Sequence, residues 1–165
     1  MLFWKNIKDF LHSYSYTHGQ FFLISFPKTG RTWLMYMIEQ LQLISNNNSS
    51  IDKFFLLNEH DNSEIIIENG YRNNPLDIFK FTSRNKYKRA KVIFLVRDPR
   101  DVVVSHFHQI TKRSVNPFIF ENISEFIRDE VLGFNRIIHY YNLWYNNKNI
   151  PEEFLLVRYE DLLIK

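Results

Sequence analysis

The sequence predicts an α/β fold, a P-loop-like, doubly wound parallel sheet flanked by helices, and three observations lead to it. Short apolar runs alternate along the chain with segments of helical periodicity. The first apolar run, residues 21–26, leads through a glycine-containing loop directly into a helical pattern. The run VIFLV at 92–96 is apolar without alternation, which is typical of a strand covered on both faces. With 165 residues, 45% of them hydrophobic, residues 1–165 are predicted to form a single domain.

The first elements follow from the spacing of apolar residues. Residues 1–19 are predicted to form an N-terminal amphipathic segment, because their apolar side chains recur at helical spacing. We expect this segment to pack on the domain, with attachment to a membrane surface as the alternative. After the strand at 21–26, a helix is predicted to begin near Trp33 and to end before the turn residues 46–50. Its buried stripe is expected to be Leu34, Met37, Ile38 and Leu41.

The rest of the chain repeats the alternation. Further strands are predicted at 53–57, 91–96 and 154–158, and helices at about 99–111, 123–131 and 134–146. The last helix is expected to bury one stripe, formed by Phe134, Ile137, Ile138, Tyr141 and Tyr145. The apolar residues of the polar stretch 61–89 show only weak periodicity, so no strand or helix is predicted there. Its basic residues are interpreted as a solvated surface: Arg84, Lys86, Lys88 and Arg89.

Composition limits the classes of function. The chain has 21 Lys and Arg against 18 Asp and Glu, a net charge of +3, which suits an anionic ligand but is too balanced to indicate nucleic-acid binding. It has no Cys, so it forms neither a disulfide nor a thiolate metal site, and this fits a cytoplasmic protein. No apolar run approaches the roughly 20 residues that span a bilayer, so no transmembrane segment is predicted. The oligomeric state cannot be read from the sequence.

The loop Ser25 to Thr32, reading SFPKTGRT, is predicted to bind an anion. Between a strand and a helix start, backbone N–H groups and the positive end of the helix dipole point to one spot, which suits a phosphate. The spacing approaches the P-loop pattern G-x-x-x-x-G-K-[ST], but Ser25 stands for its first Gly and Arg31 for its Lys. A kinase-like phosphotransferase with Mg²⁺ is therefore a poorer fit and stays as an alternative.

Three segments resemble, in order, the motifs of sulfotransferases that use 3′-phosphoadenosine 5′-phosphosulfate (PAPS). PKTGRTW at 27–33 resembles the 5′-phosphosulfate loop, VIFLVRDPRDVVVS at 92–105 the 3′-phosphate motif, and FLLVRYEDLL at 154–163 a strand and turn of that fold. The resemblance implies transfer of a sulfuryl group from PAPS, without a metal, to a hydroxyl or amine of a small-molecule or carbohydrate acceptor. It also implies that a C-terminal region that clamps the cofactor in the family is absent here. A non-catalytic, truncated nucleotide-binding relative is the other alternative.

The resemblance assigns roles to the loop residues. Lys28 matches the lysine placed at the bridging or leaving phosphate oxygen, so it is both a catalytic and a cofactor-binding candidate; a surface lysine is the alternative. The backbone N–H groups of Thr29, Gly30, Arg31, Thr32 and Trp33, with the Thr32 hydroxyl, would hold the 5′-phosphate. Trp33 matches the adenine-stacking tryptophan, with a core aromatic as the alternative. Arg31 replaces a threonine common in animal cytosolic members.

The resemblance also assigns cofactor-binding roles to residues of two further segments. Arg97 and Ser105 match the 3′-phosphate ligands of the family, the alternatives being a salt bridge for Arg97 and a solvent-exposed hydroxyl for Ser105. Asp98 is expected to cap the helix that follows, with Pro99 in its first turn. Tyr159 matches a tyrosine at the adenine edge, with core packing as the alternative.

His60 is the candidate general base, because His titrates near neutral pH. It lies in LLNEHDN and resembles the His-Asp that bacterial sulfotransferases place after a strand. Asp61 is either a group that orients His60 or a loop carboxylate without that role. His106 and His108 are two residues apart on a predicted helix and would point to different faces, so they do not form a metal-binding pair. No metal site is predicted.

Overall fold

The computed structural model describes residues 5–7, 9–10, 20–45, 56–59, 85–114 and 119–163. Four strands form one sheet in the order β2-β1-β3-β4. The strands are β1 (Gln20–Ser25), β2 (Leu56–Glu59), β3 (Ala90–Val96) and β4 (Glu153–Arg158). All three neighbouring pairs are parallel, as predicted, so their carboxyl ends meet at one edge.

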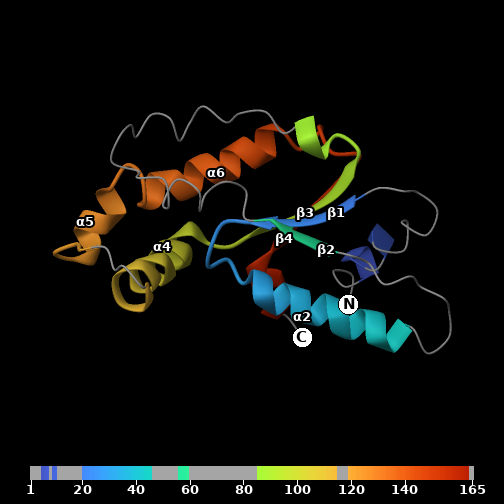
Figure 1. Ribbon diagram of the computed structural model, residues 1–165, viewed down its shortest axis with the longest axis horizontal. Coiled ribbons are helices and arrows are strands. Elements are labelled where there is room, and N and C mark those ends of the chain that lie inside the picture. The colour runs from blue at the N-terminus through green and yellow to red at the C-terminus, as the bar shows by residue number, and fades with distance from the viewer. Residues whose placement is uncertain are drawn as a thin grey trace.

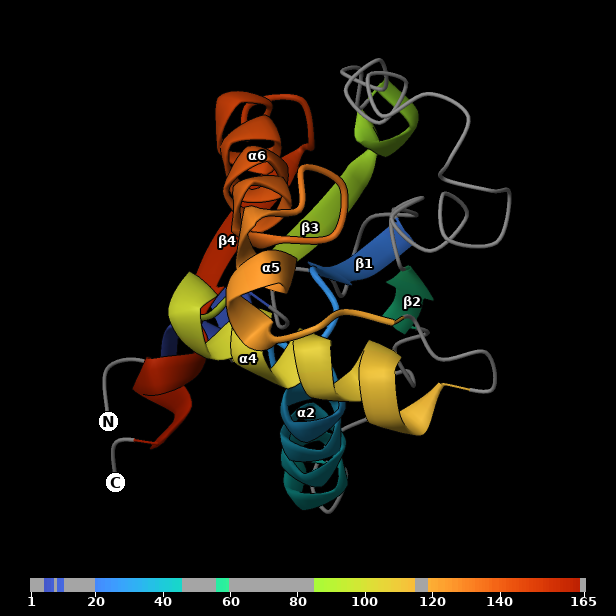
Figure 2. The ribbon, with the colours of Figure 1, turned by 90° about the vertical axis from the view of Figure 1, so that its left-hand side faces the viewer.

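Helices cover both faces of this sheet, which makes the fold doubly wound. In Figure 1, α2 (Arg31–Ser45) lies below the sheet and α6 (Phe134–Asn146) lies above it. The helices α4 (Pro99–His108) and α5 (Ile123–Arg128) lie side by side beyond the end of the sheet, in front in Figure 2. The parallel α/β prediction is therefore confirmed.

The core has two halves because successive strand residues face opposite sides. Phe22 and Phe94 contribute to the half that contains the buried Trp144 of α6. Leu23 and Ile93 contribute to the other half, with the following buried residues from α2 and the N-terminal segment: Leu34, Ile38 and Ile7. The described part of residues 1–19 is helical, and Ile7 is completely buried.

The buried side of the last helix differs from the stripe predicted from the periodicity of its apolar residues. The buried residues of α6 are Arg136, Ile137, Tyr140 and Trp144, whereas Tyr145 is 55% exposed. Ile137, Tyr140 and Trp144 follow the spacing of a narrow stripe, and Tyr145 lies about a quarter-turn outside it. The described end of the unassigned stretch also enters the core, because Tyr87 is fully buried and its ring meets Phe22 edge-on.

Other boundaries shift by a few residues. The described strand β2 ends at Glu59 instead of residue 57, and residues 53–55 lie outside the described part of the chain. The helix predicted at 99–111 ends as an α-helix at His108 and continues as a π-helical turn, Gln109–Arg113. These shifts leave the order of elements unchanged.

Candidate functional site

The loop between β1 and α2 has an unusual backbone. Lys28 has a φ of 70°, a conformation that non-glycine residues adopt rarely, and Gly30 has a φ of 95°. The buried Thr29 hydroxyl donates to the Phe26 carbonyl oxygen at 2.8 Å, which fixes the loop internally. Thr29 can therefore offer a ligand its backbone N–H, but its hydroxyl is already used.

The helix α2 starts directly after this loop. Leu34 N donates to Gly30 O at 3.1 Å, so the helix is hydrogen-bonded from Gly30 onward. The N–H groups of a first helical turn have no acceptor within their own helix, and the helix dipole adds positive potential there. The sequence-based expectation of a strand, a tight loop and a helix start is confirmed at this point.

A cavity of about 600 Å³ joins this loop to the segment after β3. Its lining residues are Ser25, Phe26, Pro27, Lys28, Gly30, Arg31, Thr32, Trp33, Arg97, Ser105 and Gln109. Residues from two motifs far apart in the sequence therefore share one space, because β1 and β3 are neighbours and end at the same edge. Trp33 is 49% exposed, so it is not a core aromatic residue.

Two buried polar atoms suit an anionic ligand in this cavity. Ser25 Oγ and Arg97 Nε are buried, and neither makes a hydrogen bond within the described part of the chain. Ser25 as a whole is 1% exposed. Both groups can donate a hydrogen bond, and both belong to residues that line the cavity. An oxyanion placed there would satisfy them.

The Tyr159 ring packs between the loop and Arg97. A Cβ atom added to Gly30 would lie 2.4 Å from the Tyr159 ring, so no larger residue fits this position without movement. On the other side, the Arg97 guanidinium carbon lies 4.6 Å from the ring centroid, a cation–π contact. The structure thus gives Tyr159 a packing role that joins the two phosphate-binding candidates, and contact with an adenine stays a prediction.

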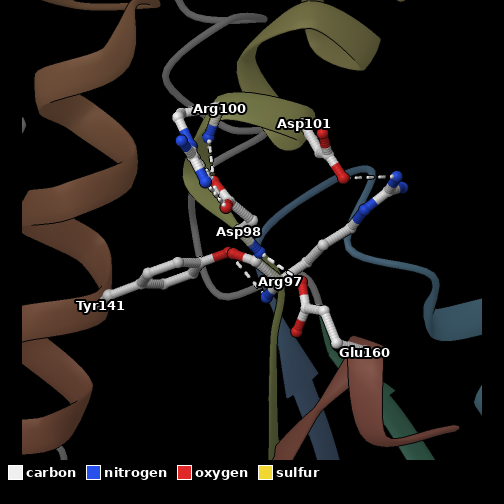
Figure 3. Close-up of polar contacts among 6 residues, drawn as sticks. All are labelled: Arg97, Asp98, Arg100, Asp101, Tyr141 and Glu160. Atoms are coloured by element: carbon white, nitrogen blue, oxygen red, sulfur yellow. Dashed lines mark hydrogen bonds and ion pairs between the residues drawn. The ribbon is translucent and has the colours of Figure 1, made fainter. Parts of the chain in front are cut away.

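The backbone that carries Arg97 is clamped from two directions (Figure 3). Tyr141 Oη, from α6, accepts from Arg97 N at 3.2 Å and donates to Arg97 O at 3.0 Å. Glu160, from the short helical turn after β4, accepts from Asp98 N at 2.7 Å through Oε1. Burial raises the pKa of Tyr141 to about 12, so its hydroxyl keeps the proton that it donates.

The Arg97 side chain extends away from Tyr141 and meets Asp101 (Figure 3). Arg97 Nη2 lies 3.2 Å from Asp101 Oδ2, so the salt bridge considered from the sequence is present. The Asp101 side chain is 60% exposed, and ion pairs of this kind contribute little free energy. Arg97 therefore remains available to a ligand in the cavity.

The helix that follows Arg97 is capped as expected. Asp98 Oδ1 accepts from Arg100 N at 2.9 Å, and Pro99 occupies the first turn of α4. The Arg100 side chain also pairs with Asp98 at 2.5 Å. Hydrogen bonds from the Arg100 side chain and backbone lower the pKa of Asp98 to about 2. Asp98 is thus engaged in helix capping.

His106 lies buried behind the loop. Its ring meets the rings of Phe26 and Phe126 edge-on, at centroid distances of 5.6 and 5.8 Å. Burial, together with the nearby charge of Arg136, lowers its pKa to about 4. His108 is exposed, so the two histidines do point to different faces. His106 is neutral at physiological pH and serves as a packing residue.

The predicted site residues fall into three groups. One group lines the cavity: Lys28, Gly30, Arg31, Thr32, Trp33, Arg97 and Ser105. Thr29 and Tyr159 lie behind it and support the loop. His60 and Asp61 lie outside the described residues, although β2, which ends at Glu59, is parallel to β1 and ends at the same edge.

Sequence reasoning missed three residues of this region. Gln109 lines the cavity and accepts from Lys28 Nζ at 3.3 Å, whereas Tyr141 and Glu160 clamp the backbone at Arg97 and Asp98. For Gln109 a signal existed, because it is four residues after Ser105 on a predicted helix and so shares its face. The described residues contain no cluster of three potential metal ligands and no helix long and apolar enough to cross a bilayer.

Comparisons with known proteins agree with this geometry. The family model described as "Sulfotransferase domain" matches residues 18–164. The chain is 26% identical to an amine sulfotransferase of Oryctolagus cuniculus and 28% identical to a flavonol 3-sulfotransferase of Flaveria bidentis. Each match covers 86% of this chain, but 50% of the first relative and 51% of the second. The chain thus spans about half the length of the curated relatives it matches.

A solved structure shares the fold. The crystal structure of mouse sulfotransferase SULT7A1 complexed with PAP matches at a TM-score of 0.51 and 20% identity. The match covers 96% of this chain and 57% of that one. Because the family model covers nearly the whole sequence, this chain belongs to the sulfotransferase domain family.

Proposed function

We propose that this protein is a sulfotransferase that moves a sulfuryl group from PAPS to a hydroxyl or amine of a small-molecule or carbohydrate acceptor. The observation that carries the proposal is the shared cavity of about 600 Å³. It joins the helix-start loop to Arg97 and Ser105, and so offers donors to two separate phosphate groups. The lack of cysteine fits a reducing compartment, and we propose the cytoplasm as its location.

The proposed reaction needs orientation and charge more than covalent help from the protein. The acceptor oxygen or nitrogen forms a bond to sulfur while the bond from sulfur to the phosphate oxygen breaks. Adenosine 3′,5′-bisphosphate leaves with that electron pair, and the acceptor proton passes to a base. By analogy with phosphoryl transfer, most of the rate enhancement would come from positioning and from stabilising charge on the leaving oxygen.

The loop residues would hold the 5′ end of the donor. Backbone N–H groups of Thr29 to Trp33 and the Thr32 hydroxyl would bind the 5′-phosphate, and Lys28 would stabilise the leaving oxygen. Lys28 and Thr32 both line the cavity, which supports this assignment. Trp33, exposed on the cavity wall, offers a surface on which an adenine can stack.

The residues after β3 would hold the 3′-phosphate. Arg97 and Ser105 line the same cavity as the loop and supply charged and neutral donors. The adenine edge is assigned to Tyr159. His60 is proposed to take the acceptor proton. It directly follows the last described residue of β2, and β2 neighbours the strand that leads into the loop.

Ligand-dependent stability and sulfuryl transfer test this function. Adenosine 3′,5′-bisphosphate should raise the melting temperature without Mg²⁺ and by more than adenosine 5′-phosphate, because only the former uses Arg97 and Ser105. In a second experiment, the protein should transfer radiolabelled sulfur from PAPS to an acceptor in a panel of phenols, amines and sugars. Equal stabilisation by ATP that requires Mg²⁺ would favour a kinase-like enzyme instead. Binding without transfer to any acceptor would favour the non-catalytic relative.

A further inference from the structure

One contact of Lys28 reaches beyond its own loop. Lys28 Nζ donates a hydrogen bond to Gln109 Oε1 at 3.3 Å, across 81 residues of sequence. Both side chains are half-buried, and both line the cavity with Ser105. The Gln109 amide therefore holds the Lys28 ammonium group against the helix that carries Ser105.

The local backbone explains how Gln109 reaches this place. Gln109 follows Ser105 by four residues, which keeps the two on one side of the helix. At Gln109 the α-helix changes to the π-helical turn Gln109–Arg113. Thr111 Oγ1 donates to Phe107 O at 2.7 Å, a side-chain bond that bends helices by competing with their backbone bonds. Wide turns of this kind are often found at functional sites.

The chemistry of the acceptor matters as much as its position. An amide oxygen is neutral, so it can hold an ammonium group while leaving its positive charge uncompensated. A carboxylate in the same position would form an ion pair with Lys28 and would also repel an incoming phosphate. The hydrogen bond from the Lys28 ammonium group to this neutral amide oxygen is weaker than one to a negatively charged phosphate oxygen, so a ligand can displace the amide.

We propose that Gln109 is a positioning residue for Lys28. In the site without ligand, its amide restrains the Lys28 ammonium group beside α4, and a phosphate oxygen that enters the cavity competes with the amide for that group. The competition step rests on the proposed function, whereas the restraint itself does not. Residue 109 thereby sets how readily Lys28 turns to the ligand.

Site-specific acylation of lysines tests the restraint without any cofactor. The whole chain is labelled with trace acetic anhydride, and the rate at each lysine is measured by mass spectrometry. In Gln109→Met, which has nearly the same shape but no acceptor oxygen, Lys28 should react about 3- to 10-fold faster, the equivalent of one lost hydrogen bond. In Gln109→Glu, which keeps an acceptor, Lys28 should react no faster than in the wild type.

Internal and matched controls separate this effect from general loosening. The rate at Lys112, exposed in the same turn, should not change, and Gln40→Met, at an exposed position on α2, should leave Lys28 as in the wild type. Equal Lys28 rates in the wild type and Gln109→Met would overturn the proposal. Faster reaction in both Gln109 variants would also overturn it, because loss of the acceptor would then not be the cause.

Titration with adenosine 3′,5′-bisphosphate tests the competition step. Gln109→Glu should bind it about 10-fold more weakly, whereas Gln109→Met should bind it at least as tightly as the wild type. Weakening in both variants would overturn the competition step. Failure of the wild type to bind the bisphosphate would overturn the proposed function and the competition step together, and the acylation rates would still decide whether Gln109 restrains Lys28.

Discussion

Tyr141 hydrogen-bonds both polar groups of the Arg97 backbone through a single hydroxyl. Its Oη lies 3.2 Å from Arg97 N, which donates to it, and 3.0 Å from Arg97 O, which accepts from it. Arg97 comes directly after β3, where the sheet no longer pairs its backbone. Tyr141 of α6 thus makes the backbone hydrogen bonds that a neighbouring strand would otherwise make. These bonds fix the point from which the Arg97 side chain enters the cavity.

Tyr141→Phe should destabilise the fold and weaken ligand binding together. Removing the hydroxyl leaves two partly buried backbone groups without a partner, which costs about 1 to 3 kcal/mol of unfolding free energy. Bisphosphate affinity should fall by about 3- to 10-fold, because Arg97 is no longer held in place. Chemical denaturation and calorimetric titration measure the two effects. Tyr145→Phe, on the exposed side of the same helix, is the control, and equal stability of the two variants would contradict the clamp.

Replacing Arg97 with alanine should mainly affect binding, whereas replacing Lys28 with alanine should mainly affect the rate of transfer. Arg97→Ala should weaken bisphosphate binding by about 10- to 100-fold, the value of a charge-assisted hydrogen bond. Lys28→Ala should reduce binding less and the rate of transfer more, because its charge is needed where the leaving oxygen gains negative charge. Titration and single-turnover transfer separate the two. The same pattern of losses in both variants would speak against this division of roles.

Gly30→Ala should disrupt the contact between the loop and Tyr159. The added Cβ would lie 2.4 Å from the Tyr159 ring, and the residue would keep a φ of 95°, so we expect a loss of about 1 to 3 kcal/mol in stability. In a Tyr159→Ala background, the part of this stability loss that comes from the steric clash should disappear, whereas the part that comes from backbone strain should remain. A double-mutant cycle followed by denaturation measures the difference. Additive losses would show that the ring does not limit the size of residue 30.

His106 should make stability depend on pH below neutrality. Burial and the charge of Arg136 lower its pKa from 6.5 to about 4, so between these values the unfolded chain binds the proton and the folded chain does not. The His106 contribution is therefore complete above pH 6.5 and is lost as the pH falls towards 4, by up to about 3 kcal/mol. Denaturation at several pH values should show that the free energy of unfolding changes less steeply with pH in His106→Phe than in the wild type. His108→Ala, at an exposed position on the same helix, is the control for the loss of a histidine.

The sequence predicted the parts of this protein that depend on local pattern. Apolar runs of strand length identified the sheet, and the loop around Lys28 was recognisable because a strand, a glycine and a helix start follow one another directly. The Asp98 cap was equally local, since it involves Arg100 two residues away. In each case the partners lie within one short segment.

Contacts between distant segments were not predictable in this way. Tyr141 reads as one more aromatic residue of an apolar helix stripe, and nothing in its neighbours shows that its hydroxyl reaches Arg97, 44 residues earlier. The approach of Tyr159 to Gly30 likewise depends on strand order, because β4 joins the sheet beside β3. The hydrogen bond of Gln109 with Lys28, 81 residues earlier, also joins two distant segments, although the place of Gln109 on the helix face of Ser105 was predictable.

His60→Asn tests the proposed base by separating binding from chemistry. If His60 takes the acceptor proton, the variant should lose about 10²- to 10⁴-fold in sulfuryl transfer and keep its bisphosphate affinity, because the 3′- and 5′-phosphate donors are unchanged. Transfer by the wild type should also decline as the pH falls below the His60 pKa, since a protonated ring cannot accept a proton. The measurement is transfer from radiolabelled PAPS, with Asp61→Asn as the companion variant that tests the orienting carboxylate. If His60→Asn kept near wild-type transfer, His60 would leave the mechanism, and the buried, neutral His106 would be a poor replacement because its pKa is already lowered to about 4.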